Sequence, residues 1–223
     1  MPPGTQIFDP GWALDNLDQI GTRIGQHLIL TIFPLLIGIG VALVLSIIAI
    51  RRPRTYSPIT AISGLLYTIP SLAAFAVLRP IFGLSLVTAF IPLATYTLLI
   101  LFRNFTAGFY NVPKDILEAA EGMGYTRRER LLRVELPLAV PLIISGIRLA
   151  TVTTIGLATV VAVLGDSFGG LGQLITEGIQ TFFPTKYLLG AILSVGLAVG
   201  ADFLLVRFEH WVTPWAHAKS RAR

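Results

Sequence analysis

Three long runs without a single charged residue dominate the first half of the chain. They cover residues 28–50, 55–78 and 80–102, which are 23, 24 and 23 residues long. At a rise of about 1.5 Å per residue, each run would extend roughly 34 Å as a helix, enough to cross a hydrocarbon core of about 30 Å. The whole chain is 54% hydrophobic and only 13% charged, too apolar to cover a soluble domain with polar side chains. We therefore expect an all-α polytopic membrane protein, and the composition excludes an ordinary cytosolic enzyme.

The second half of the chain predicts two further spans, which makes five transmembrane helices. A fourth apolar stretch covers residues 136–165 and is interrupted only by Arg148, and a fifth covers residues 187–206 with Asp202 near its end. Residues 166–186 between them are rich in glycine and polar residues, but their apolar residues recur at helical spacing. They predict a short interfacial or re-entrant helix on the extracytoplasmic side.

The two ends of the chain differ from the apolar middle. Residues 1–26 are mixed and weakly acidic, and no cationic region there leads into a short apolar run with a cleavage site. We interpret them as an extracytoplasmic N-terminal segment, not as a removable signal peptide. Residues 27–206 are expected to form a single transmembrane domain, followed by a basic cytoplasmic tail over residues 207–223.

The basic residues predict the orientation. With the N-terminus outside, 13 of the 17 lysines and arginines lie in the inner segments, three lie in the outer segments, and Arg148 lies within a span. The positive-inside rule then places the C-terminus and the loop of residues 103–135 in the cytoplasm. Because the basic residues form no aromatic-interleaved patch, no nucleic-acid partner is expected.

The loop of residues 103–135 carries six basic and five acidic residues and must lie in water. Good helix formers predict a helix over residues 114–123, with Gly124 as its C-terminal cap. Thr126 and Glu129 form the pattern of a capping box, which opens a second helix expected to end at Pro137, where the fourth span begins. The loop could be a docking element for another protein or an amphipathic hairpin on the membrane surface, and composition alone favours the hairpin.

One spacing in this loop favours the docking element. The loop reads E-A-A, three residues, G, nine residues, V, one residue, L-P. The pattern resembles the signature E-A-A-x3-G-x9-I-x-L-P of permease subunits of bacterial ABC importers, with Val134 in place of isoleucine as its single departure. The positions that carry it are Glu118, Ala119, Ala120, Gly124, Val134, Leu136 and Pro137.

The resemblance implies a type I ABC importer permease fold whose first loop helix is a coupling helix, seated in a cleft of an ATP-binding subunit. Glu118 would meet a basic residue there, Ala119 and Ala120 would allow close approach, and Gly124 would make the corner. The chain has no G-x-x-x-x-G-K-[ST] phosphate loop, so ATP and Mg would be bound by separate ABC ATP-binding subunits and no cofactor is expected here.

The resemblance also implies further partners and a location. These are an extracytoplasmic substrate-binding protein and a second permease, which is either another copy of this chain or a similar one. The expected location is the bacterial cytoplasmic (inner) membrane, with lipid around the spans.

Smaller motifs extend the resemblance to one substrate class. The segments T-I-P-S-L-A at 68–73, L-F-R-N at 101–104 followed by Gly108, P-L-I-I-S-G-I-R at 141–148 and G-G-L-G at 169–172 are similar to osmoprotectant permeases for glycine betaine, carnitine or choline. A quaternary ammonium has no N–H donor and binds best to aromatic faces. Methionine and amino-acid permeases share the loop and the five spans, so they remain an alternative.

One segment of the second span is the candidate gate or pathway. It contains Tyr67, Pro70, Ser71 and Phe75, where the proline frees a backbone carbonyl and the serine offers a hydroxyl. A plain packing kink is the alternative reading.

Arg148 and Asp202 are the two ionisable residues within predicted spans. Charges inside a membrane are functional candidates, and these two are expected near the inner end of their helices. Either they form an intramembrane pair that stabilises one conformation, or each extends to the inner interface.

Two other classes fit less well. A membrane enzyme would need a reactive cluster, but His27, His210 and His217 lie near or beyond the span ends without carboxylates or a nucleophile around them. We therefore expect no catalytic residue and no metal site. A passive channel would leave the loop motif without a role.

Overall fold

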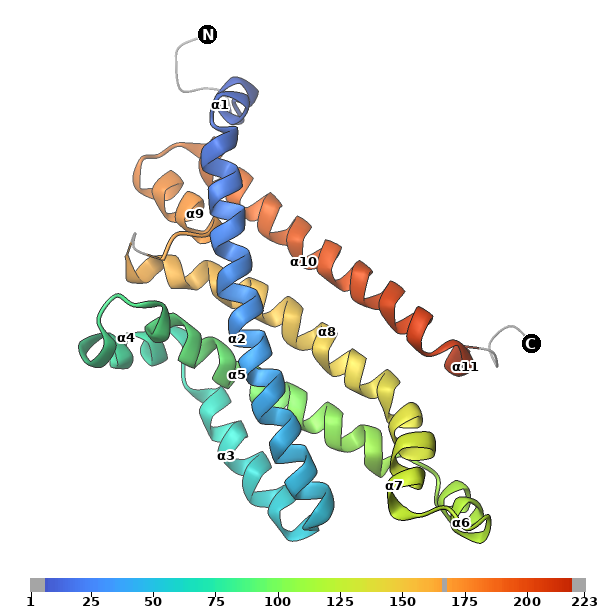
Figure 1. Ribbon diagram of the computed structural model, residues 1–223. Helices are drawn as coiled ribbons and strands as arrows, with labels where there is room; N and C mark the ends of the chain where they lie inside the picture. The colour runs from blue at the N-terminus through green and yellow to red at the C-terminus, as the bar shows by residue number, and fades with distance from the viewer. Residues whose placement is uncertain (1–6, 166–167, 218–223) are drawn as a thin grey trace.

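The computed structural model describes residues 7–165 and 168–217. All regular secondary structure in that part of the chain is helical (Figure 1). The first six residues, Asp166 and the tail residues Lys219, Arg221 and Arg223 lie outside the described residues.

Four long apolar helices confirm the first, third, fourth and fifth predicted spans. They are α2 (Leu17–Arg51), α5 (Leu86–Tyr110), α8 (Leu136–Val160) and α10 (Pro184–Val212). Two of them are longer than expected. α2 begins within the predicted N-terminal segment, just after α1 (Pro10–Asp15), and α10 continues beyond residue 206 into the predicted tail.

The second predicted span is wrong as a straight helix. Residues 55–78 are divided between the end of a short 3-10 turn (Pro53–Thr55), α3 (Tyr56–Thr68) and most of α4 (Ser71–Phe82), and the α3 and α4 segments are bent by 89°. Pro70 explains the break, because the residue before a proline is driven out of the helical region and Ile69 has φ −64° and ψ 126°. A turn at Gly83, with φ +64°, then leads into α5.

The prediction that a helix ends at Pro137 is also wrong. α7 (Arg127–Arg130) passes through a π turn (Leu131–Glu135) directly into α8, which gives a continuous 38-residue helix from Arg127 to Leu164. The Leu136 N–H bonds to the Leu131 carbonyl in the wider π pattern. Pro137 follows at the start of α8, and the wider turn before it lets the chain continue although proline provides no N–H.

The short elements lie at opposite ends of the molecule. In Figure 1, α1 and the predicted short helix α9 (Leu171–Gln180) lie at the top, whereas α6 (Lys114–Gly122) and α7 lie at the bottom. We call these the α9 end and the α6 end. A 3-10 turn (Val161–Leu164) closes α8 at the α9 end, and α11 (Pro214–His217) follows α10.

The core lies where α2, α5 and α8 cross. One cluster of buried side chains includes Leu30, Phe75, Leu93 and Val161, and a second includes Leu35, Leu101 and Phe105. Outward-facing apolar side chains remain exposed on α2 and α10, as expected where lipid covers the surface.

Two glycines let α5 and α8 approach closely. A Cβ built on Gly146 would lie 2.5 Å from the Asn104 Cβ, and one on Gly108 would lie 2.9 Å from the Ala139 carbonyl oxygen. Small residues at a crossing are a common way to pack helices in membranes. Asn104, Gly108 and Gly146 belong to the segments 101–108 and 141–148 that resemble osmoprotectant permeases, so part of that resemblance reflects helix packing.

Candidate functional site

The loop helix α6 and its glycine corner form as predicted. Pro113 directly precedes the helix, and Gly124 adopts φ +81°. The Tyr125 N–H bonds to the Ala120 carbonyl at 3.1 Å, and the Gly124 N–H bonds to the Glu121 carbonyl at 2.9 Å. This is a Schellman motif, in which a left-handed residue ends the helix and satisfies its last carbonyls. The glycine is therefore required by the backbone conformation of the corner.

The capping box that opens α7 is confirmed. The Glu129 N–H bonds to the Thr126 hydroxyl at 3.3 Å, and the Thr126 N–H bonds to the Glu129 carboxylate at 3.0 Å. The hydrogen bond from the Thr126 backbone, followed by that from its hydroxyl, lowers the pKa of the Glu129 carboxyl. This carboxylate thus keeps its charge and its capping role in mildly acidic solution.

Arg130 ties α6 to the long helix behind it. Its Nε lies 2.7 Å from a Glu135 carboxylate oxygen, and its guanidinium also pairs with Glu121 at the end of α6. The arginine therefore holds both sides of the corner in one arrangement. The sequence pattern did not single out this link, because the three residues carry no recognisable motif.

The motif residues on α6 face two directions. Glu118 and Ala119 are exposed, whereas Ala120 is only 1% exposed and faces the interior of this chain. An acidic side chain beside a small one provides an outward surface that a basic groove of another protein can approach closely. Ala120 serves the packing of α6 on its own chain, a role that differs from the one implied by the resemblance.

The remaining motif residues lie on the continuous helix of α7 and α8. Val134 and Pro137 are half-buried and Leu136 is exposed, all around the π turn. No break separates this turn from the apolar part of α8, so the motif residues and the span belong to one continuous helix.

The candidate gate residues divide into two groups. Tyr67, Pro70 and Ser71 surround the α3–α4 bend, and the Tyr96 hydroxyl of α5 donates a hydrogen bond to the Ile69 carbonyl at that bend. The rings of Tyr67 and Tyr96 pack edge to face with centroids 5.9 Å apart. The bend is thus held from a neighbouring helix, by a tyrosine that the gate prediction did not include.

Phe75 lies elsewhere. Its side chain is fully buried in the core cluster with Leu30 and Leu93, where it anchors α4 to α2 and α5. This position favours a packing role for Phe75 over a place along a pathway.

Arg148 and Asp202, the two ionisable residues of the predicted spans, form an ion pair, and a third residue joins them. The Arg148 Nε and one terminal nitrogen lie 2.9 and 3.2 Å from the two Asp202 oxygens, and the other terminal nitrogen lies 3.2 Å from Glu209. Glu209 was missed because the fifth span was expected to end at residue 206. Its spacing of seven residues from Asp202 places both carboxylates on one face of α10.

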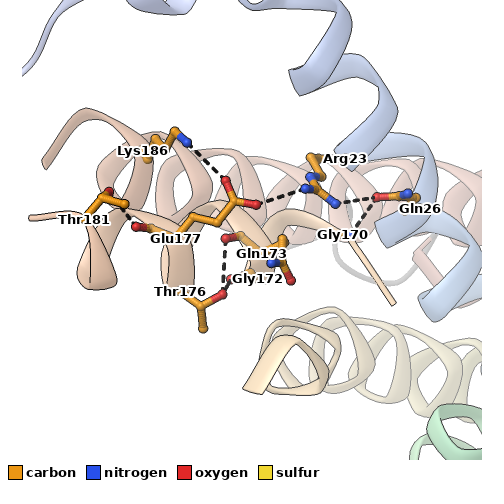
Figure 2. Close-up of polar contacts among 9 residues, drawn as sticks. All are labelled: Arg23, Gln26, Gly170, Gly172, Gln173, Thr176, Glu177, Thr181 and Lys186. Carbon is orange, nitrogen blue, oxygen red and sulfur yellow. Dashed lines mark hydrogen bonds and ion pairs between the residues drawn. The ribbon is translucent and has the colours of Figure 1, made fainter. Parts of the chain in front are cut away.

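A second polar network lies at the α9 end (Figure 2). Glu177 of α9 accepts from Arg23 of α2 at 3.0 Å and from Lys186 of α10 at 3.1 Å. Gln26 also accepts the Gly170 N–H at 3.0 Å. These contacts join three helices, and no motif in the sequence indicated them.

His27 completes the attachment of α9. Its ring is fully buried, its Nδ1 accepts the Leu171 N–H at 3.3 Å, and its Nε2 lies 3.2 Å from the Ile155 carbonyl. Both ring nitrogens are used in structural hydrogen bonds. Within the described residues, no group of three or more histidine, cysteine or acidic side chains is arranged to hold a metal ion.

Fold and loop together define a class, a polytopic helical membrane protein with an exposed acidic loop helix that Arg130 ties to the start of a long apolar helix. Residues 19–214 match the family of binding-protein-dependent transport system inner membrane components. The chain belongs to this family and is a permease subunit of an ABC importer.

Characterised relatives resemble it over nearly their whole length. The carnitine transport permease protein OpuCB of Listeria monocytogenes is 35% identical over 207 residues, which cover 93% of this chain and 94% of the relative. The choline transport system permease protein OpuBB of Bacillus subtilis (strain 168) is 34% identical, over 85% of this chain and 86% of the relative. The osmoprotectant import permease protein OsmW of Salmonella typhimurium is 33% identical, covering 91% and 96%.

Solved structures share the fold. An inward-facing structure of the MetNI methionine ABC transporter superposes with a TM-score of 0.77 at 22% identity, covering 89% of this chain and 98% of the other. An amino acid ABC transporter with histidines superposes with a TM-score of 0.74 at 17% identity, and the match covers 89% of this chain and 96% of the other. At these identities the likeness establishes the fold.

Proposed function

We propose that this permease subunit moves a quaternary-amine osmoprotectant, such as glycine betaine, carnitine or choline, into the cell by alternating access driven by a separate ABC ATPase. The observation that carries the coupling is the continuity from the exposed α6 face, through the Gly124 corner and the Arg130 contacts, into the helix from Arg127 to Leu164. ATP and Mg are bound by the partner, and this chain carries no catalytic residue.

The complex in this proposal contains two ATP-binding subunits, an extracytoplasmic substrate-binding protein and a second permease, either another copy of this chain or a similar one. The α6 end lies in the cytoplasm of a bacterial inner membrane and the N-terminus lies outside. The excess of arginine and lysine at the α6 end supports this orientation.

Two membrane sites have proposed roles in the transport cycle. The bend at Tyr67, Pro70 and Ser71 acts as the gate, since the hydrogen bond from Tyr96 gives it an attachment that can be broken and remade. The pairs of Arg148 with Asp202 and Glu209 stabilise one conformation by holding α10 against α8.

The substrate class rests on the relatives, which are named as permeases for carnitine, choline and osmoprotectants. Transport of methionine or another amino acid is the second candidate, and its support is the fold that this chain shares with methionine and amino acid ABC transporters.

The test is uptake by the reconstituted complex of this chain with its ATP-binding subunits and binding protein. Labelled glycine betaine, carnitine, choline, proline and methionine are supplied in turn, with ATP or with a non-hydrolysable analogue inside the vesicles. We expect ATP-dependent uptake of at least one quaternary amine and none of methionine. Uptake of methionine alone would refute the substrate class, and uptake that ignores ATP would refute the importer mechanism.

A further inference from the structure

A cavity of about 1060 Å³ lies between the C-terminal part of α2, the C-terminal part of α5 and the helix that begins with α7. One wall is apolar and includes Leu43, Ile47 and Phe105. At the α6 end the lining is charged, with four arginines and two glutamates. They are Arg51, Arg127, Arg128, Arg130, Glu121 and Glu135.

The charged lining has an excess of unpaired cations. Arg130 already binds both glutamates, whereas Arg51, Arg127 and Arg128 form no ion pair with any residue that the structure describes. Three guanidinium groups at one cavity thus have donors available for an anion, and guanidinium groups bind phosphate in bidentate fashion.

The depth of the cavity matches one leaflet of a membrane. Leu43 and Arg51 are eight residues apart on α2, about 12 Å along a helix, compared with roughly 15 Å for half of a hydrocarbon core. Leu43 and Ile47 are also 49% and 43% exposed on the outer face of α2, so the apolar wall is continuous with the surface that lipid covers. A free phosphate ion has no apolar group that could pack against this wall.

We infer that the cavity binds one anionic phospholipid, with its phosphate at Arg51, Arg127 and Arg128 and its acyl chains along Leu43 and Ile47. Basic pockets between membrane helices suit anionic headgroups, and each arginine near the surface contributes about fivefold in affinity. The site does not depend on which substrate is transported, so a failure of the uptake test leaves it unaffected.

Lipid retention by the intact complex tests the site. The complex of this chain with its ATP-binding subunits is purified in micelles containing equal amounts of phosphatidylglycerol and phosphatidylcholine, and bound lipids are counted by native mass spectrometry. For the double variant Arg51→Gln with Arg128→Gln we expect roughly a 25-fold loss of phosphatidylglycerol affinity. The matched control, Arg52→Gln with Arg54→Gln, removes the same charge from residues that do not line the cavity and should lose much less phosphatidylglycerol affinity.

A second measurement leaves the arginines in place. The sequence has no cysteine, so Leu132→Cys provides a single labelling position at the cavity. A fluorophore there should be quenched by brominated phosphatidylglycerol and much less by brominated phosphatidylcholine.

Three results would overturn the inference. The first is an equal loss of phosphatidylglycerol affinity in the control pair, and the second is equal quenching of the fluorophore by both brominated lipids. The third is cross-linking of Leu132→Cys to an ATP-binding subunit, which would mean that protein fills the cavity.

Discussion

At the scale of single residues, glycines determine how the helices meet and where the loop turns. Gly124 could be predicted as the α6 corner from the sequence, because a glycine after a run of helix formers is a local signal. Gly146 could be identified only within a segment resembling relatives, since its role depends on Asn104, a residue 42 positions away on another helix. Local backbone rules are enough to predict a glycine that caps a helix, whereas the role of a glycine at a helix crossing depends on tertiary packing.

Replacing Gly146 with alanine should loosen the α5–α8 crossing. The new Cβ would lie 2.5 Å from the Asn104 Cβ, so the helices must separate, at a cost of about 1–3 kcal/mol. The matched control is Gly156→Ala on the same helix, where a Cβ meets nothing within 4 Å. We expect a lower unfolding temperature in detergent for Gly146→Ala and an equal or higher one for the control. Equal temperatures for both variants would contradict the packing account.

At the scale of elements, the spacing and length of the apolar runs predict helices, but they do not predict where a helix breaks or continues. Pro70 bends a span by 89°, whereas Pro137 lies within a continuous helix. The surroundings of the two prolines differ: Tyr96 holds the Ile69 carbonyl at the first, and a π turn precedes the second. Neither contact has a signal in the local sequence.

The Arg148 pairs should couple α8 to α10. We expect a double-mutant cycle of Arg148→Ala and Asp202→Ala to be non-additive by at least about 0.5 kcal/mol, because each single change removes the same contact. The quantity to measure is thermal stability of the reconstituted complex together with its uptake rate. Additive losses in both readouts would show that the two residues act separately, and Glu209→Ala reports the contribution of the third member.

At the scale of the whole molecule, charge placement predicts the orientation of the chain. The four long apolar helices and the loop helix with its glycine corner could be predicted from the sequence, whereas the 89° bend in the second span and the network of Arg23, Glu177 and Lys186 could not. Arg23 is 154 residues before Glu177 in the sequence, and the predicted boundary at residue 26 separated it from the membrane domain.

Cysteine labelling checks the orientation. Because the chain has no native cysteine, Leu14→Cys in α1 and Met123→Cys at the α6 corner give one reactive thiol each, at residues that are 68% and 67% exposed. A membrane-impermeant maleimide should label the first in intact cells and the second only after the membrane is opened. The reverse pattern would place the docking helix outside and contradict the proposed coupling.

Coupling through α6 is the central claim, and substrate-stimulated ATP hydrolysis in proteoliposomes measures it most directly. The complex is compared with Glu118→Lys, which reverses the exposed charge on α6, and with Asp18→Lys, which makes the same change at the far end of α2. We predict that Glu118→Lys lowers stimulated hydrolysis and uptake at least tenfold, since a reversed charge would oppose docking, while Asp18→Lys retains both activities. Stimulation and uptake unchanged by Glu118→Lys would contradict coupling through α6.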